Sequence, residues 1–130
     1  MVGQTISHYR ILEKLGEGGM GEVYLAEDTS LHRKVALKFL PKLLGEDPIA
    51  RRRFVREAQS AAALDHPFIC NIHEVGQYDD KDFLVMEYVE GETLMERLGS
   101  GPLSLRMALQ IAVEIAQALG KAHQSSIIHR

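Results

Sequence analysis

Two stretches decide the fold: Leu15-Gly16-Glu17-Gly18-Gly19-Met20-Gly21-Glu22-Val23 and, further along, Val35-Ala36-Leu37-Lys38. The first predicts a strand, a glycine-rich turn and a second strand. A loop without Cβ atoms lets backbone N–H groups come close to polyphosphate oxygens, and it can adopt positive φ where a turn requires it. The first stretch therefore indicates a lid over a ligand that carries phosphates.

The residues after the glycines separate two kinds of lid. Gly16, Gly18 and Gly21 match G-x-G-x-x-G, which in dinucleotide-binding folds opens a helix and is followed by an acidic residue about 20 positions on. Here the next segment is Glu22-Val23-Tyr24-Leu25-Ala26-Glu27, whose β-branched and aromatic content favours a strand. The glycines are therefore predicted to lie in a hairpin, and a dinucleotide-dependent oxidoreductase, whose glycines open a helix, is disfavoured.

The second stretch supplies a pocket wall. Side chains alternate between faces along a strand, so Val35, Leu37 and Phe39 lie on one face, and Ala36 and Lys38 on the other. For a lysine considered alone, the ordinary interpretation is a solvated residue at a strand edge. Beside a glycine lid, a small residue followed by a lysine instead indicates a pocket with a cation at its end.

Composition describes ordinary globular material. The 130 residues are 45% hydrophobic and 25% charged, and the formal net charge of −3 gives no reason to expect a nucleic-acid partner. The single cysteine, Cys70, excludes an internal disulfide framework and fits a reducing cytosol; we expect it to be a small buried residue. No signal peptide and no membrane-spanning apolar run are expected.

A helix with a functional glutamate is predicted after the second stretch. Asp47-Pro48 supplies a capping acid and a proline at the first helical position, and Asp65-His66-Pro67 ends the helix after about residue 64. Glu57 lies inside this helix. It can form an exposed ion pair with Arg53, four residues earlier, or be the partner of Lys38.

The remaining segments complete one sheet and begin a helical part. Strands are expected at 9–15, 71–76 and 83–87, with an exposed charged turn at 79–82, which makes five strands in all. His66 and His73 lack zinc spacing, so no metal site is assigned. A connector follows at 87–91, and ligands often bind at such junctions.

Two helices should follow, at about 93–98 and, capped by Ser104, at 104–124. Apolar residues occupy nearly the whole circumference of the longer helix, which predicts burial on several sides. Because the later segments that would cover this surface are not among the 130 residues, we expect the chain to expose a large apolar face and to be poorly soluble or to self-associate through residues 104–124.

Five motifs in order resemble those of protein kinases: the glycine lid, Val35-Ala36-Leu37-Lys38, Arg56-Glu57 ahead of His66-Pro67-Phe68-Ile69, the connector from Leu84 to Leu94, and Ile127-Ile128-His129-Arg130. Arg56-Glu57-Ala58-Gln59 and Gly91-Glu92-Thr93-Leu94 are most similar to bacterial serine/threonine kinases of eukaryotic type. The resemblance covers almost the entire chain.

The resemblance implies an α+β fold with a kinase N-lobe at about 9–87 (five antiparallel strands and one helix), a hinge at 87–91 and the start of a helical C-lobe at 92–130. Lys38 and Glu57 would be the catalytic pair. Met86 would be the gatekeeper, the Glu87 carbonyl would accept from the adenine amino group, and the Val89 amide would donate to the ring. The implied nucleotide-binding residues are Leu15, Gly16, Glu17, Gly18, Gly19, Met20, Gly21, Val23, Ala36, Lys38, Met86, Glu87, Val89 and Leu94.

The function implied is phosphoryl transfer from ATP to Ser/Thr hydroxyls of a protein substrate, in the cytoplasm, with Mg²⁺. The chain stops one residue before the aspartate of H-R-D, so the catalytic base and the metal ligands would lie beyond Arg130. We therefore expect the 130 residues alone to be inactive, within a parent protein that could be anchored to a membrane after its kinase domain. The alternative is a non-catalytic nucleotide-binding or regulatory interaction module.

Overall fold

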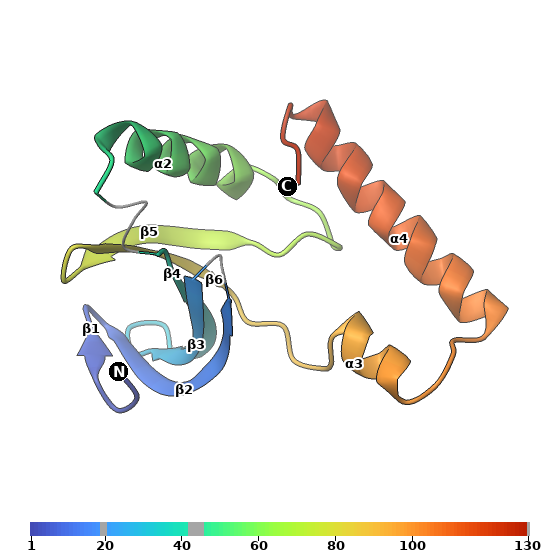
Figure 1. Cartoon of the computed structure of the whole chain (residues 1–130), viewed down its shortest axis with the longest axis horizontal. Coiled ribbons are helices and arrows are strands. Elements are labelled where there is room, and N and C mark those ends of the chain that lie inside the picture. Colours follow the sequence, from blue (N-terminus) through green and yellow to red (C-terminus); the bar gives the residue numbers. More distant parts are fainter. Residues whose placement is uncertain (19–20, 42–45, 130) are drawn as a thin grey trace.

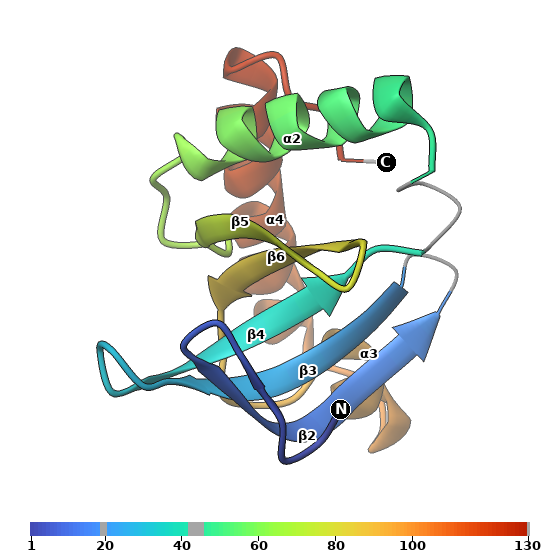
Figure 2. The ribbon, with the colours of Figure 1, turned by 90° about the vertical axis from the view of Figure 1, so that its left-hand side faces the viewer.

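A six-stranded antiparallel sheet and one helix form the first two thirds of the chain in the computed structural model, which describes residues 1–18, 21–41 and 46–129. Its strands are β1 (Thr5–Ile6), β2 (Tyr9–Gly18), β3 (Gly21–Asp28), β4 (Arg33–Phe39), β5 (Ile72–Tyr78) and β6 (Lys81–Glu87). They lie in the order β1-β2-β3-β4-β6-β5. The sheet is strongly curled, with its long strands wrapped around one interior (Figures 1 and 2).

The first strand is a finding that the sequence did not predict, because five strands were expected and residues 1–8 had been given no structure. Thr5 and Ile6 pair with Arg10 and Tyr9 of β2. The side chain of Ile6 is 1% exposed and belongs to the central apolar cluster. The two-residue strand therefore closes one end of the sheet by placing an isoleucine over the core.

The core follows the predicted alternation of β4. Val35, Leu37 and Phe39 are all buried. They pack with residues of β1, β2, β3 and β6, which gives a cluster of ten buried side chains: Ile6, Tyr9, Ile11, Tyr24, Ala26, Val35, Leu37, Phe39, Phe83 and Val85. Ala36 and Lys38, on the opposite face of β4, do not belong to this cluster.

Helix α2 (Pro48–Ala62) begins as predicted, because the Asp47 side chain accepts from the amide of Ile49 at 2.9 Å and Pro48 occupies the first turn. The helix packs along β5 (Figure 2). Near its N-terminal end, Arg51 Nε donates to both carboxylate oxygens of Asp82, each at 3.0 Å. This contact anchors α2 to the start of β6.

The turn between β5 and β6 corrects one expectation. Asp79 and Asp80 have φ of 48° and 58°, so both central residues are left-handed, as in the two-residue hairpin turns that fit the twist of a sheet. The charged segment 79–82 was expected to be exposed throughout. Instead Asp82 is 3% exposed, because the strand begins at Lys81 and directs this carboxylate toward Arg51.

Two helices complete the chain. Helix α3 (Leu94–Gly99) starts with a capping box formed by Thr93 and Glu96, and α4 (Leu105–Gln124) starts with Ser104 accepting from the amide of Met107. The two helices lie beside the sheet rather than on its core (Figure 1). The apolar face expected to be exposed on α4 in this chain is found: of the α4 residues, all of which the structure describes, only Ala122 is buried.

Candidate nucleotide-binding site

The glycine-rich lid is a hairpin, as its flanks predicted. Strands β2 and β3 pair up to Gly18 and Gly21, and the predicted site residues Gly19 and Met20 lie outside the described residues. Gly21 has φ of +109°, and a Cβ built there would lie 1.8 Å from the carbonyl oxygen of Phe39. Only glycine fits this position, since any other residue would clash with the backbone of β4. Because a strand follows Gly21, the dinucleotide-binding alternative is excluded.

A lysine at the base of the lid joins carboxylates from both strands. Lys14 Nζ lies 2.5 Å from Glu17 Oε2 and 3.0 Å from Glu22 Oε1. The hydrogen bond from Lys14 lowers the pKa of Glu22, so this carboxylate stays ionised and paired. Next to Lys14, the pairing register shifts at Leu15, a predicted contact to the adenine ring, and leaves its side chain exposed.

The sheet face opposite the core gathers four of the predicted site residues. Directly paired residues of neighbouring antiparallel strands share one face. The register therefore sets two rows across β3, β4 and β6: one is Val23, Lys38 and Leu84, and the other is Leu25, Ala36 and Met86. The predicted pocket-wall residues from three strands thus lie together, with the Lys38 ammonium beside them.

Leu25 and Leu84 belong to the same rows but were not assigned to the site. Each pairs with a predicted residue, Leu25 with Ala36 and Leu84 with Lys38. The sequence does predict the sheet face on which Leu84 lies, because Leu84 and Met86 alternate with the core residues Phe83 and Val85. The missing information was the register that joins β4 to β6.

The connector begins at Glu87, the last residue of β6. Its amide donates to the carbonyl of Asn71 at 2.8 Å, and its carboxylate accepts from the amide of Asn71 at 3.1 Å. Beyond it, Val89 is 67% and Leu94 is 42% exposed. Apolar side chains at this degree of exposure are accessible to a ligand, and none of the residues that the structure describes covers them.

The predicted pair of Lys38 and Glu57 is not formed in this structure. Lys38 is half-buried on the sheet face, whereas Glu57 is exposed on α2. Among the ion pairs of the described residues, Glu57 joins neither Lys38 nor its alternative partner Arg53. The role of Glu57 therefore stays a prediction, about an arrangement in which α2 approaches β4 more closely.

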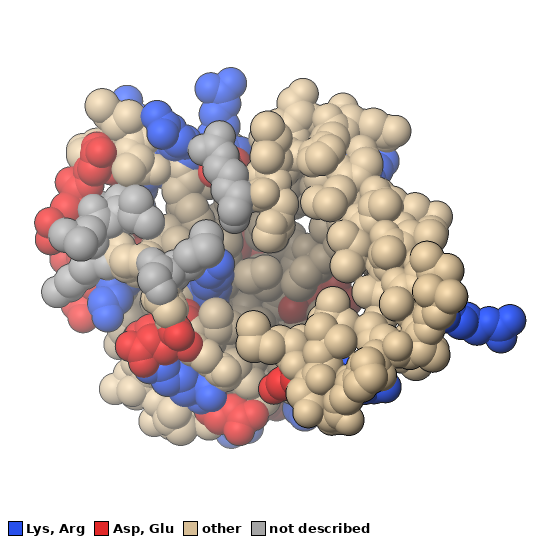
Figure 3. Space-filling view, turned by 45° about the vertical axis from the view of Figure 1, so that its right-hand side comes forward, with Lys and Arg blue, Asp and Glu red and all other residues tan. Residues whose placement is uncertain are grey.

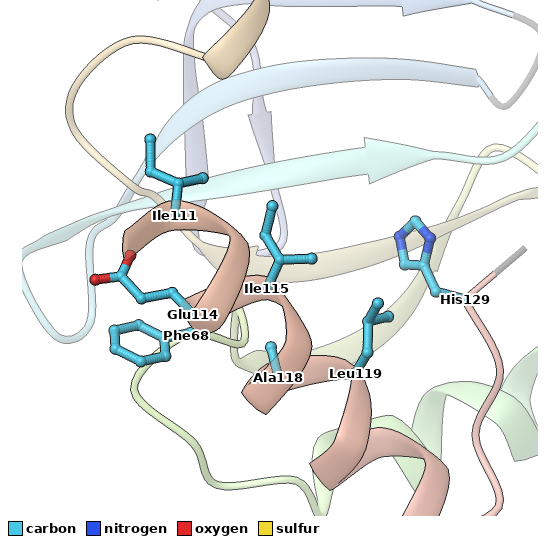
Figure 4. A pocket seen from close by; sticks show the side chains of 7 residues that line it. All are labelled: Phe68, Ile111, Glu114, Ile115, Ala118, Leu119 and His129. Atoms are coloured by element: carbon cyan, nitrogen blue, oxygen red, sulfur yellow. The ribbon is translucent and has the colours of Figure 1, made fainter. Parts of the chain in front are cut away.

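An open pocket of about 560 Å³ lies elsewhere, against α4 (Figure 4). Its lining is largely apolar and comes from the loop before β5, from α4 and from the C-terminal segment: Phe68, Ile111, Glu114, Ile115, Ala118, Leu119 and His129. None of these residues belongs to the predicted nucleotide site. Figure 3 shows the molecular face between the two regions, hollowed at its centre, with most charged side chains on the sheet side and few on the helical side.

Two histidines were set aside as non-ligands. His66 Nδ1 accepts from the amide of Phe68 at 3.1 Å, a contact within the turn that precedes β5. Within the described ranges, no group of three or more His, Cys, Asp or Glu side chains is arranged to hold a metal ion. Cys70, expected to be buried, is instead exposed, because it lies in the loop before β5.

Comparisons with known proteins agree on one family. Residues 9–130 match the protein kinase domain. The chain is 49% identical over 132 residues to the serine/threonine-protein kinase PrkC of Bacillus subtilis and 46% identical over 127 residues to PknB of Mycolicibacterium smegmatis. These alignments cover 100% and 94% of the chain, but only 20% of each relative.

Solved structures give the same result for the fold. The kinase domain of PknI from Mycobacterium tuberculosis superimposes with a TM-score of 0.87 at 34% identity, over 100% of this chain and 54% of that one. The chain therefore spans about half of that kinase domain and a fifth of the curated relatives. No helix among the described residues is both long and apolar enough to cross a membrane.

Proposed function

Because the chain belongs to the protein kinase family, we propose that it forms the ATP-binding part of an enzyme that transfers the γ-phosphoryl group of ATP to Ser or Thr hydroxyls of a protein. The observation that carries this proposal is the convergence of Val23, Ala36, Lys38 and Met86 on one sheet face, next to a lid that admits only glycine at position 21. The relatives are named serine/threonine kinases, which favours catalysis over a purely regulatory module.

We assign the phosphates to the lid and to Lys38. The glycines at 16, 18, 19 and 21, with Glu17 and Met20 between them, would bring backbone N–H groups close to the phosphate oxygens. Lys38 would contact the α- and β-phosphates as a cation at the end of the pocket wall. Glu57 would hold the Lys38 ammonium once α2 has moved toward β4, since family members use such a pair.

We assign the adenine ring to the wall and the hinge. Leu15, Val23, Ala36 and Leu94 would contact its faces, and Met86 would lie behind it. The backbone of Glu87 and Val89 would accept from and donate to its edge. With these contacts the ligand would lie at the junction between residues 9–87 and 92–130, which we propose as the N-lobe and the start of the C-lobe, joined by a hinge at 87–91.

We assign the metal and the reaction itself to other motifs of the kinase family. Phosphoryl transfer in this family relies on Mg²⁺ to neutralise charge on the phosphates. In the family motifs, the catalytic aspartate and the magnesium ligands come after the histidine and arginine that His129 and Arg130 match. The present residues would contribute the binding and orientation of the nucleotide. We propose the cytoplasm as the location, because ATP is present there and a single cysteine fits a reducing compartment.

Replacement of Lys38 by methionine tests this assignment. One charge-assisted contact is worth about 1.5–3 kcal/mol, so Lys38→Met should weaken a fluorescent ATP analogue at least about tenfold and abolish transfer by the full-length protein. Lys34→Met is the matched control, because Lys34 lies on the same strand face but at its exposed end. Unchanged nucleotide affinity in Lys38→Met would remove the basis of the proposal.

A further inference from the structure

Glu87 departs from the hydrogen-bond pattern of the sheet at the point where β6 becomes the hinge. Ile72 and Met86 are the last paired residues of β5 and β6, so Asn71 faces Glu87 one step beyond. Facing residues at such a position normally exchange two N–H···O=C bonds. Only one is formed here: the Glu87 amide donates to the Asn71 carbonyl at 2.8 Å.

In the second bond, a side-chain oxygen of Glu87 replaces the backbone carbonyl oxygen as the acceptor. The Asn71 amide donates to Glu87 Oε2 at 3.1 Å, so the side chain of Glu87 takes the place that its own backbone carbonyl would fill. The backbone amide of Asn71 is thereby satisfied, and the Glu87 carbonyl is released from the ladder.

The released carbonyl has a weak partner. Cys70 Sγ lies 3.3 Å from the Glu87 oxygen. Although Cys70 as a whole is exposed, partial burial of its thiol and then the negative charge of Glu87 raise the pKa of that thiol, so at neutral pH it carries the proton that it donates. A thiol is a weak donor and a carbonyl oxygen has two lone pairs, so the oxygen retains capacity for a stronger donor.

We propose that the Glu87 carboxylate is a positioning group for purine selectivity: by accepting from the Asn71 amide, it keeps the Glu87 carbonyl free for the exocyclic amino group of a 6-aminopurine. The inference rests on the proposed function, because it assumes a nucleotide at the hinge. The carboxylate does not touch the ligand. It acts through the backbone oxygen of its own residue.

A role in stability alone makes a different prediction. If the contact between Asn71 and the carboxylate only fastens β5 to β6, its loss lowers the free energy of unfolding and leaves the choice between purines unchanged. If it frees the carbonyl, its loss allows the Asn71 amide to recapture that oxygen. Ligands with a 6-amino donor are then weakened, whereas ligands with an oxygen at that position are not.

The experiment measures the affinities of the full-length protein for ATP and for inosine triphosphate by calorimetry. In Glu87→Leu, which has no acceptor, the ratio of the two affinities should fall about fivefold, the value of one ordinary hydrogen bond. Glu87→Gln retains a side-chain carbonyl and should keep the ratio of the unsubstituted protein. Glu92→Leu, at an exposed position five residues later, controls for loss of a surface charge.

The outcomes distinguish nucleotide binding itself from the role of the Glu87 carboxylate in purine selectivity. An unsubstituted protein that binds neither nucleotide contradicts the proposed function. A protein that prefers ATP, with the same preference in Glu87→Leu, overturns this inference and leaves the proposed function intact. Should Glu87→Leu fail to fold, Glu87→Asp serves instead: its shorter side chain keeps the charge but not the reach, and an unchanged ratio there also overturns the inference.

Discussion

The curled sheet and helix α4 are both rich in apolar residues, but these residues are buried in the sheet and exposed on the helix. Along β4 the core-facing side chains are buried, and Val35 and Leu37 are inaccessible to solvent. Along α4, apolar residues are at least as frequent, yet Leu105, Leu109 and Val113 are 76%, 58% and 54% exposed. Patterning states which surface an element needs to bury, but the partner that buries it must also be present. The sheet contains its partners in its own strands, and α4 does not.

The largest effect that the comparison predicts is in the core. Phe39 is 2% exposed and packs against the rings of Tyr24 and Phe83, so Phe39→Ala should cost about 3–5 kcal/mol in the free energy of unfolding. The matched change on the helix, Leu105→Ala, should cost less than about 0.5 kcal/mol. Urea denaturation of both variants measures the difference, and equal costs would contradict the contrast.

A second test is at the lid. Gly21→Ala forces a side chain into a left-handed backbone and against the Phe39 carbonyl, which should cost about 1–3 kcal/mol and weaken nucleotide binding. Gly18→Ala adds a methyl group where nothing lies within 4 Å, and its cost in stability should stay below about 1 kcal/mol. Thermal unfolding compares the two, and a Gly21→Ala protein as stable as Gly18→Ala would refute the geometry.

The exposed helix predicts an effect on association rather than on stability. In Leu109→Glu with Val113→Glu, charges replace two neighbouring apolar side chains of α4, so the 130-residue chain should self-associate less while its unfolding free energy changes by less than about 1 kcal/mol. Sedimentation at micromolar concentration measures the mass. Gln110→Glu with Gln117→Glu adds the same charge without removing apolar surface, and a monomeric parent chain would contradict the prediction.

The smallest effect concerns the cap of α3. Glu96 accepts from the Thr93 amide at 2.6 Å and from its hydroxyl at 3.0 Å, and these bonds lower the pKa of Glu96 below its ordinary value of 4.5. A carboxylate with a lowered pKa in the folded state stabilises above the unfolded pKa and loses that contribution as the pH falls through the folded one. NMR titration should place the Glu96 midpoint below 4.5, and in Thr93→Ala it should move up.

Sequence patterns predicted the elements well where the signal is local. The cap at Asp47 and the lid hairpin each depend on residues a few positions apart, and the structure confirms them. Three expectations failed because they depend on distant partners. Asp82 is buried because Arg51 reaches it from another element, Ile6 because β2 offers an edge, and Cys70 is exposed because its loop lies outside the core.

In the candidate site, too, local patterns predicted some features, whereas others depend on residues distant in the sequence. Alternation placed Ala36 and Lys38 on one face, but the addition of Leu25 and Leu84 required the strand register. The contact of the Glu87 side chain with Asn71 had no signal in the sequence, because it joins residues 16 positions apart across two strands. The separation of Lys38 from Glu57 depends on the placement of a whole helix, which no local pattern specifies.

The anchor of α2 determines how that separation can be closed. A rigid rod fixed near one end turns a small rotation into a larger displacement further along. Glu57 lies six residues after Arg51, about 9 Å along a helix axis at 1.5 Å per residue, so a swing of about 20° about the Arg51–Asp82 contact moves it by about 3 Å. If α2 pivots about the contact of Arg51 with the buried Asp82 carboxylate, Glu57 moves toward β4 without a change in the sheet.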